Sequence, residues 1–130
     1  MVIDTSALLA ILSDEPERRS FNEAIEFAES VALSAASFIE TSIVVEARFG
    51  AEGVRDLDHF LSSAAVDVID VDVEQAYVAR RAFTEFGKGR HPAALNFGDC
   101  FSYSLAKVRG EKLLFKGGDF SKTDIESFTL

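Results

Sequence analysis

The sequence predicts an α/β fold in which a central, mainly parallel β-sheet is flanked by α-helices. Short apolar segments that suit buried strands alternate along the chain with longer segments whose apolar residues recur every three or four positions. No repeat or Pro/Gly/Ser-rich linker interrupts this alternation. A chain of 130 residues that is 48% hydrophobic is large enough for one core. We therefore expect a single domain over residues 1–130, with its ligands beyond the carboxyl ends of the strands.

Sequence signals for helix ends divide the first half of the chain into two strands and four helices. Pro16 suits the first turn of a helix, and Ser37 and Glu40 have the spacing of a capping box. Gly50 separates two apolar helical patterns. The expected elements are a strand at 2–3, a helix over 7–12, a helix over 16–29, a strand at 31–34, a helix from 37 to 50 and a helix over 52–64.

The second half continues the same alternation. Asp72 suits the N-cap of a helix that ends near Phe86, and the two glycines and the proline of residues 87–92 indicate a loop. The expected elements are a strand at 66–71, a helix over 73–86, a helix over 97–108 and a short buried strand at 112–115, before the Gly117-Gly118 turn.

Composition excludes several classes of protein. Cys100 is the only cysteine, so the chain can form neither an internal disulfide nor a cysteine-rich zinc site, and we interpret Cys100 as a small packed residue. No apolar run reaches the roughly 18 residues of a membrane helix, and Met1 does not lead into a secretion signal. We therefore expect a cytoplasmic protein that has no membrane partner.

The net charge of −9 is unevenly distributed. Residues 1–79 carry 16 acids and 4 Lys or Arg, whereas residues 80–130 carry 6 acids and 9 Lys or Arg. A polyanion such as RNA would therefore contact the second part of the chain, unless these cations are only solvated faces. The candidate contacts are Arg80, Arg81, Lys88, Arg90, Lys107, Arg109, Lys112 and Lys116.

Four acids stand where an α/β fold concentrates its chemistry. Asp4 follows the first strand, Asp119 follows the last, and Glu40 and Asp99 lie near helix starts. Hard divalent cations prefer carboxylate oxygen, and a site without histidine or cysteine favours Mg²⁺, or Mn²⁺, over zinc. Each acid also has a structural explanation as a cap, a capping-box partner or a turn residue.

The sequence around the acids resembles the PIN-domain ribonuclease toxins called VapC. The resemblance rests on four segments in the family's order: Val2-Ile3-Asp4-Thr5-Ser6, Glu40 in a helix ending Glu46-Ala47-Arg48-Phe49-Gly50, Asn96-Phe97-Gly98-Asp99-Cys100-Phe101-Ser102-Tyr103, and Lys116-Gly117-Gly118-Asp119-Phe120. It extends from residue 2 to about residue 125. It implies a PIN-like fold and a Mg²⁺-dependent endoribonuclease, the toxin of a type II toxin-antitoxin system.

The resemblance also implies a role for each acid. Asp4 and Asp99 match direct metal ligands, Glu40 matches a ligand or a residue that orients the attacking water, and Asp119 matches a variable fourth acid. The hydroxyls of Thr5 and Ser6, near the first acid, could bond the substrate phosphate, hydrogen-bond a carboxylate or cap the helix, and the cationic loop before the third acid suggests a substrate contact at Arg90. The implied partners are RNA, a second copy in a homodimer, and a VapB-type antitoxin that covers the acidic site.

Other functions remain open at this level. A housekeeping PIN endonuclease that acts in RNA processing would have the same acids. A receiver-type phosphoacceptor domain would need an acidic pair after the first strand, where Thr5 and Ser6 stand. A dehalogenase-type phosphatase would need an acid at position 6, and a non-catalytic binding module would not need four acids.

Overall fold

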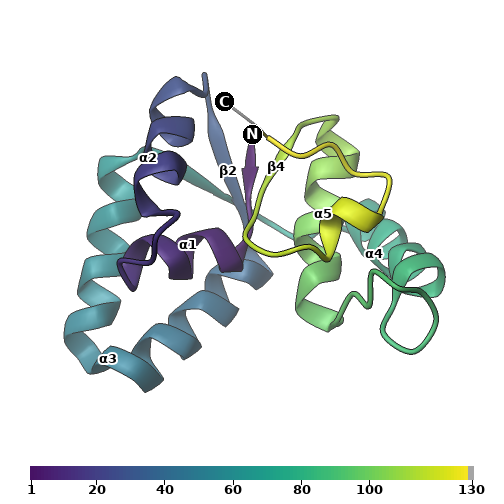
Figure 1. The fold of residues 1–130 in the computed structure, drawn as a ribbon, viewed down its shortest axis with the longest axis horizontal. Helices are drawn as coiled ribbons and strands as arrows, with labels where there is room; N and C mark the ends of the chain where they lie inside the picture. Colours follow the sequence, from purple (N-terminus) through teal and green to yellow (C-terminus); the bar gives the residue numbers. More distant parts are fainter. Residues whose placement is uncertain (129–130) are drawn as a thin grey trace.

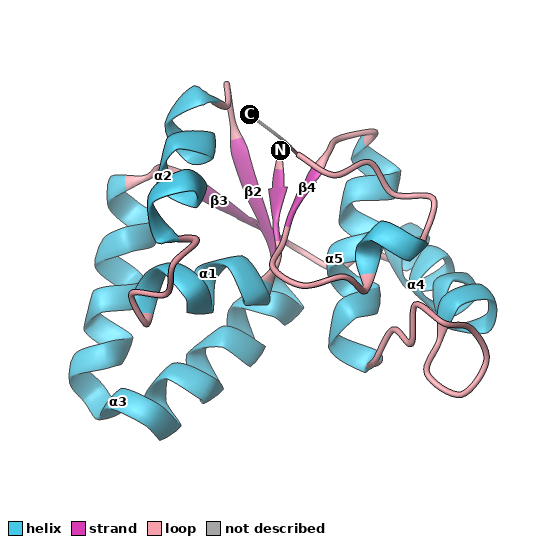
Figure 2. Ribbon diagram, viewed as in Figure 1, coloured by secondary structure: helices cyan, strands magenta, loops and turns pink. Residues whose placement is uncertain are grey.

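The sheet of the computed structural model, which describes residues 1–128, is four-stranded and parallel. Its strands are β1 (Val2–Ile3), β2 (Val31–Ser34), β3 (Val66–Ile69) and β4 (Leu113–Leu114), in the spatial order β3-β2-β1-β4 (Figures 1 and 2). Every pair of neighbouring strands is parallel, with Val2 opposite both Ala32 and Leu113. The predicted α/β class and parallel sheet are confirmed.

Helices cover both faces of the sheet. In Figure 1, α1 (Thr5–Leu12), α2 (Arg18–Phe27) and α3 (Ala35–Ser63) lie on one side, and α4 (Val73–Phe86) and α5 (Phe97–Arg109) lie on the other. A short 3₁₀ helix, η1 (Phe120–Lys122), follows β4. Within residues 1–128 no helix is long and apolar enough to cross a membrane.

Alternating side chains of the strands enter two separate cores. Val2 and Leu113 pack with α4 and α5 on one face, while Ile3 and Leu114 pack with α1, α2 and α3 on the other. All four are almost completely buried. The central strand β1 and the strand β4 are buried on both faces and therefore have apolar residues at successive positions, whereas β3, at the edge of the sheet, is only partly buried and contains Asp67.

The predicted capping box of Ser37 and Glu40 is wrong. Ser34, the last residue of β2, caps α3 by accepting a hydrogen bond from the backbone N–H of Ala36, so the cap lies three residues before the predicted one. Ser37 is instead buried inside the helix. Gly50 does separate two helical parts of α3, as predicted: its φ of 68° and ψ of −159° are not helical, and the two parts meet there at a kink, because glycine tolerates this backbone conformation.

The other helix ends agree more closely with the sequence signals. Asp72 caps α4 by accepting from the N–H of Gln75, as predicted. Asn96 and Asp99 form a reciprocal capping box at the start of α5. Elsewhere the boundaries differ by one or two residues: Pro16 precedes α2 instead of opening it, and β3 ends at Ile69. Fraying of element ends accounts for differences of this size.

The strand order reverses between β1 and β4, which makes this point of the sheet a topological switch point. From β1 it proceeds to β2 and β3, and it then crosses back to place β4 on the far side of β1. The loops after β1 and β4 therefore diverge at neighbouring carboxyl ends. Open α/β sheets bind ligands at such a switch point, and Asp4 and Asp119 follow these two strands.

Candidate active site

Asp4 is the most enclosed of the four predicted acids. It is 4% exposed and caps α1, because its Oδ2 accepts from the backbone N–H of Ser6 at 3.0 Å and from the Ser6 hydroxyl at 2.6 Å. Its Oδ1 accepts from the hydroxyl of Ser102, in α5, at 2.6 Å. The capping role expected from the sequence and a role in the site therefore coexist, and both carboxylate oxygens are held in defined positions.

Glu40 reaches the start of α5 from α3. Its carboxylate is in such close contact with Gly98 that a methyl group added there would lie 2.9 Å from Cδ and 3.0 Å from Oε1. Gly98 immediately precedes Asp99. The absence of a side chain at Gly98 thus allows acids from two different helices to approach the same place.

Asp99 has an unusual electrostatic environment. Burial raises the pKa of its carboxyl to about 6, the hydrogen bond from the backbone N–H of Asn96 opposes this rise, and the charges of Asp4, Asp119 and Glu40 add to it. Three like charges act on one half-buried group, so the four predicted acids form one electrostatic unit. A strongly perturbed carboxyl among acids at a sheet switch point is a candidate catalytic group.

Asp119 is the exposed member of the set. It precedes η1 and its side chain makes no capping hydrogen bond to that helix. The segment before it is anchored at Lys116, whose backbone N–H donates to the Ser6 hydroxyl at 3.0 Å and whose ammonium group pairs with Glu15 and Glu17. Lys116 thereby ties the β4 loop to the residues that hold Asp4.

The donor chemistry of the site fits a hard divalent cation. The four side chains offer only carboxylate oxygen, which Mg²⁺ and Mn²⁺ prefer. Within residues 1–128, however, no three Asp, Glu, His or Cys side chains are close enough together to enclose an ion. Mutual repulsion favours such an open arrangement, and Mg²⁺ usually retains several waters and takes only one or two carboxylates directly.

The three predicted substrate-binding residues have different surroundings. Thr5 is buried between α1 and α3, where its hydroxyl donates to the backbone oxygen of Ser37 and accepts from Thr41. The Ser6 hydroxyl is engaged with Asp4 and Lys116. Arg90 is exposed in the loop before α5, with its guanidinium 5.5 Å from the ring centre of Phe83. Of the three, only Arg90 presents a free polar group to solvent.

Several of the cations expected to face a polyanion are neutralised within the protein. Lys107 pairs with Asp124, Arg109 pairs with Glu111, and Lys116 pairs with two glutamates. In the part of the chain that the structure describes, the other candidates form no ion pair; they are Arg80, Arg81, Lys88, Arg90 and Lys112.

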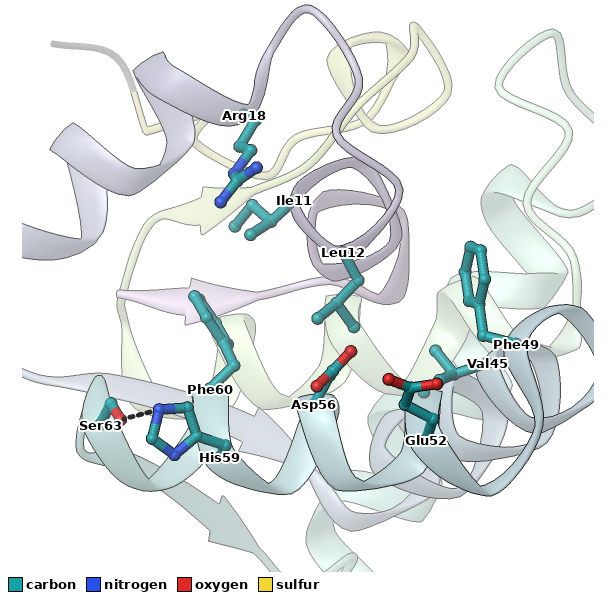
Figure 3. A pocket seen from close by; sticks show the side chains of 11 residues that line it. Ile11, Leu12, Arg18, Val45, Phe49, Glu52, Asp56, His59, Phe60 and Ser63 are labelled. Carbon is teal, nitrogen blue, oxygen red and sulfur yellow. Dashed lines mark hydrogen bonds between the residues drawn. The ribbon is translucent and has the colours of Figure 1, made fainter.

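A second polar cluster lines a cavity of about 610 Å³ between α1 and the second half of α3 (Figure 3). There the Ser63 hydroxyl contacts Nε2 of His59 at 3.4 Å, with Asp56 one turn away on the same helix. This contact is long and exposed, and no hydrogen bond joins Asp56 to His59 among the described residues. A nucleophile–base–orienter arrangement needs both bonds, so the cluster does not form a catalytic triad.

Contacts of Ser6 with Asp4 and of Asn96 with Asp99 were anticipated from the sequence, but the roles of Ser37, Gly98 and Ser102 beside the acids were not. Ser102 follows Asp99 by three positions and Ser37 precedes Glu40 by three, a spacing that places each on the same helix face as its acid. Gly98 adjoins Asp99 directly. A serine three positions from a candidate acid in a helix was therefore the sequence signal for a residue that faces the site. That spacing does not show which serine contacts Asp4.

The fold and its acidic edge define an α/β protein whose site is built from carboxylates alone. Residues 1–126 match the PIN domain family. Ribonuclease VapC30 of Mycobacterium tuberculosis is 55% identical over 130 residues, which span all of this chain and 99% of that protein. The chain belongs to the PIN domain family and, within it, to the VapC ribonucleases.

Solved structures of other sequences share the fold. The crystal structure of the Mycobacterium tuberculosis toxin VapC20 superposes with a TM-score of 0.80 at 17% identity, covering 99% of this chain and 98% of that one. A DNA-bound VapBC from Salmonella typhimurium gives a TM-score of 0.76 at 18% identity, covering 98% and 95%. The predicted PIN-like fold and family resemblance are confirmed.

Proposed function

We propose that this protein is a Mg²⁺-dependent endoribonuclease, the toxin of a VapBC-type pair, and that it acts on RNA in the cytoplasm. The observation that carries the proposal is the convergence of Asp4, Glu40, Asp99 and Asp119 on one switch point, where burial raises the pKa of Asp99 and the charges of the other three acids add to the rise. Membership of the VapC ribonucleases supports RNA as the substrate.

The proposed roles follow the enclosure of each acid. Asp4 and Asp99 are the direct ligands of Mg²⁺, for which Mn²⁺ can substitute, because their carboxylates are held by hydrogen bonds. Asp119 is exposed and acts on the ion through water or on a second ion. When bound, the divalent cation offsets phosphate charge and lowers the pKa of a water molecule. Glu40 would orient the attacking water and could accept its proton on a carboxylate oxygen.

The polar residues around the acids divide between positioning and substrate contact. Ser6 holds Oδ2 of Asp4, so we assign it a positioning role, and our proposal omits Thr5 from substrate binding because its hydroxyl is taken up by α3. Arg90 contacts RNA phosphate. Replacing Arg90 by alanine is expected to weaken the apparent affinity for RNA with little change in the maximal rate; an unchanged affinity would remove this loop from the substrate path.

The partners are proposed from the family. A VapB-type antitoxin binds the chain and obstructs its acidic site, and the toxin forms a homodimer. Growth arrest on expression, relieved by co-expression of the antitoxin encoded beside it, would distinguish a toxin from a housekeeping endonuclease. A strain that grows normally while the wild-type protein accumulates in soluble, RNA-cleaving form would favour the housekeeping function.

Cleavage of a mixed RNA pool by purified protein tests the proposed chemistry. We expect cleavage with Mg²⁺, none in EDTA, and a large loss of rate in Asp4→Asn and Asp99→Asn. Glu40→Gln should also lose rate. Its matched control is Glu46→Gln, because Glu46 lies on the same helix, six positions further along, and is exposed. Cleavage that continues in EDTA, or in both aspartate variants, would contradict the metal-carboxylate mechanism.

A further inference from the structure

A chain of buried hydroxyls extends from α3 through α5 to Asp4. The Ser102 hydroxyl donates to Oδ1 of Asp4 at 2.6 Å, and the Ser37 and Ser102 hydroxyl oxygens are 3.2 Å apart. Ser102 is completely buried, and Ser37 is only 2% exposed. We call Ser37 and Ser102 the hydroxyl chain.

The protons of the hydroxyl chain have one consistent arrangement. A serine hydroxyl carries a single proton, and Ser102 gives its proton to Asp4. Ser37 must therefore donate to Ser102, although distance alone would allow either direction. Both donors point toward Asp4, and hydrogen bonds in such a series strengthen one another.

These contacts leave one position open on the Asp4 carboxylate. An ionised carboxylate has about four lone-pair sites. Oδ2 accepts two hydrogen bonds from Ser6, from its backbone N–H and its hydroxyl, and Oδ1 accepts one from Ser102. Among residues 1–128 no other group donates to this carboxylate, so one lone pair of Oδ1 remains, and Asp4 can offer a cation a single oxygen in a direction that the Ser102 hydrogen bond sets.

We propose that Ser102, supported by Ser37, is a positioning residue that directs Oδ1 of Asp4 toward the metal. The proposal rests on the metal-dependent function above. It gives a reason for the burial of two serines at the contact of α3 and α5. An apolar pair would fill the same space, but Oδ1 of Asp4 would then have no hydrogen bond, and only the bonds from Ser6 to Oδ2 would orient the carboxylate.

Ser104 provides a matched control on the same helix. Like Ser102 it is completely buried, but its hydroxyl donates to the backbone oxygen of Phe101 at 3.1 Å and has no contact with Asp4. Ser102→Ala and Ser104→Ala remove the same atom from equally buried sites of α5. A difference in metal binding between them therefore reports on Asp4 and not on packing.

Binding of Mn²⁺, followed by the loss of the free-ion EPR signal, tests the proposal without RNA. Circular dichroism confirms that each variant is folded. We expect Ser102→Ala to weaken Mn²⁺ binding by about 10- to 100-fold, as loss of the partners of metal ligands does, and Ser104→Ala to leave it unchanged. Ser37→Ala should weaken binding less, and should have no further effect once Ser102 is alanine, because the two hydroxyls act in series.

The outcomes separate this inference from the proposed function. Equal Mn²⁺ affinity of folded Ser102→Ala and Ser104→Ala would overturn the positioning role. If, in the same experiment, the wild type binds Mn²⁺ and Asp4→Asn does not, the proposed metal site would still be supported. A wild-type protein that does not bind Mn²⁺ would overturn both. If Ser102→Ala does not fold, Ser37→Ala decides: weaker binding than Ser104→Ala supports the role, and equal binding overturns it.

Discussion

Replacing Gly98 by alanine should separate catalysis from stability. The added methyl group would overlap Oε2 of Glu40 and lie 2.9 Å from its Cδ. These atoms are the far end of a flexible side chain, so the carboxylate should move instead of the backbone. Glu40 would then leave the start of α5, and with it the neighbourhood of Asp99.

The substitution should affect the stability and the cleavage rate in opposite directions. Gly98 lies in the first turn of α5 and is not among the glycines with positive φ, so alanine fits its backbone. Such a change stabilises a protein by about 0.4–1 kcal/mol, chiefly by restricting the unfolded chain. The free energy of unfolding should therefore stay level or rise. The rate of RNA cleavage should fall by roughly 10- to 100-fold, as when a metal site loses a supporting group.

Two measurements check this reasoning. Initial rates of RNA cleavage at saturating Mg²⁺ give the loss of activity, and urea unfolding in EDTA gives the stability. In a Glu40→Ala background, Gly98→Ala should cause no additional loss of rate, because the displaced group is already absent. If Gly98→Ala cleaves RNA at the wild-type rate, or if it lowers the rate equally with and without Glu40, the proposed dependence on Glu40 is refuted.

Two further predictions concern charge. In EDTA, Asp99→Asn should raise the melting temperature, because it removes a half-buried charge that is repelled by three others. Added Mg²⁺ should raise the melting temperature of the wild type only. An unchanged or lower melting temperature of the variant in EDTA would contradict this prediction. For Asp124, burial raises the pKa, but hydrogen bonds from Lys107 and Tyr103 outweigh it and leave the pKa lowered. Its stabilisation is therefore present above the unfolded pKa of about 4 and lost as pH falls through the folded value, so unfolding of Asp124→Asn should depend less on acid pH than that of wild type.

Most of the fold was accessible from local sequence. Strands buried on both faces must be short apolar runs, and Asp72 and Asn96 cap their helices through bonds to residues three positions away. Such signals involve only neighbouring residues. The start of α3 was misplaced because Ser34 and Ser37 both offer a hydroxyl, and only the packing of Ser37 against Ser102 shows which of them is inside the helix.

The sequence alone determined the four acids and the order of the elements that carry them, because residue chemistry and apolar periodicity are local properties. Tertiary structure decided how the acids are held. Asp4 meets a serine 98 positions away, Glu40 rests against a glycine of another helix, and Lys116 donates to Ser6 across 110 positions. Contacts over such separations depend on how the strands are ordered and how the helices pack, which no local pattern records.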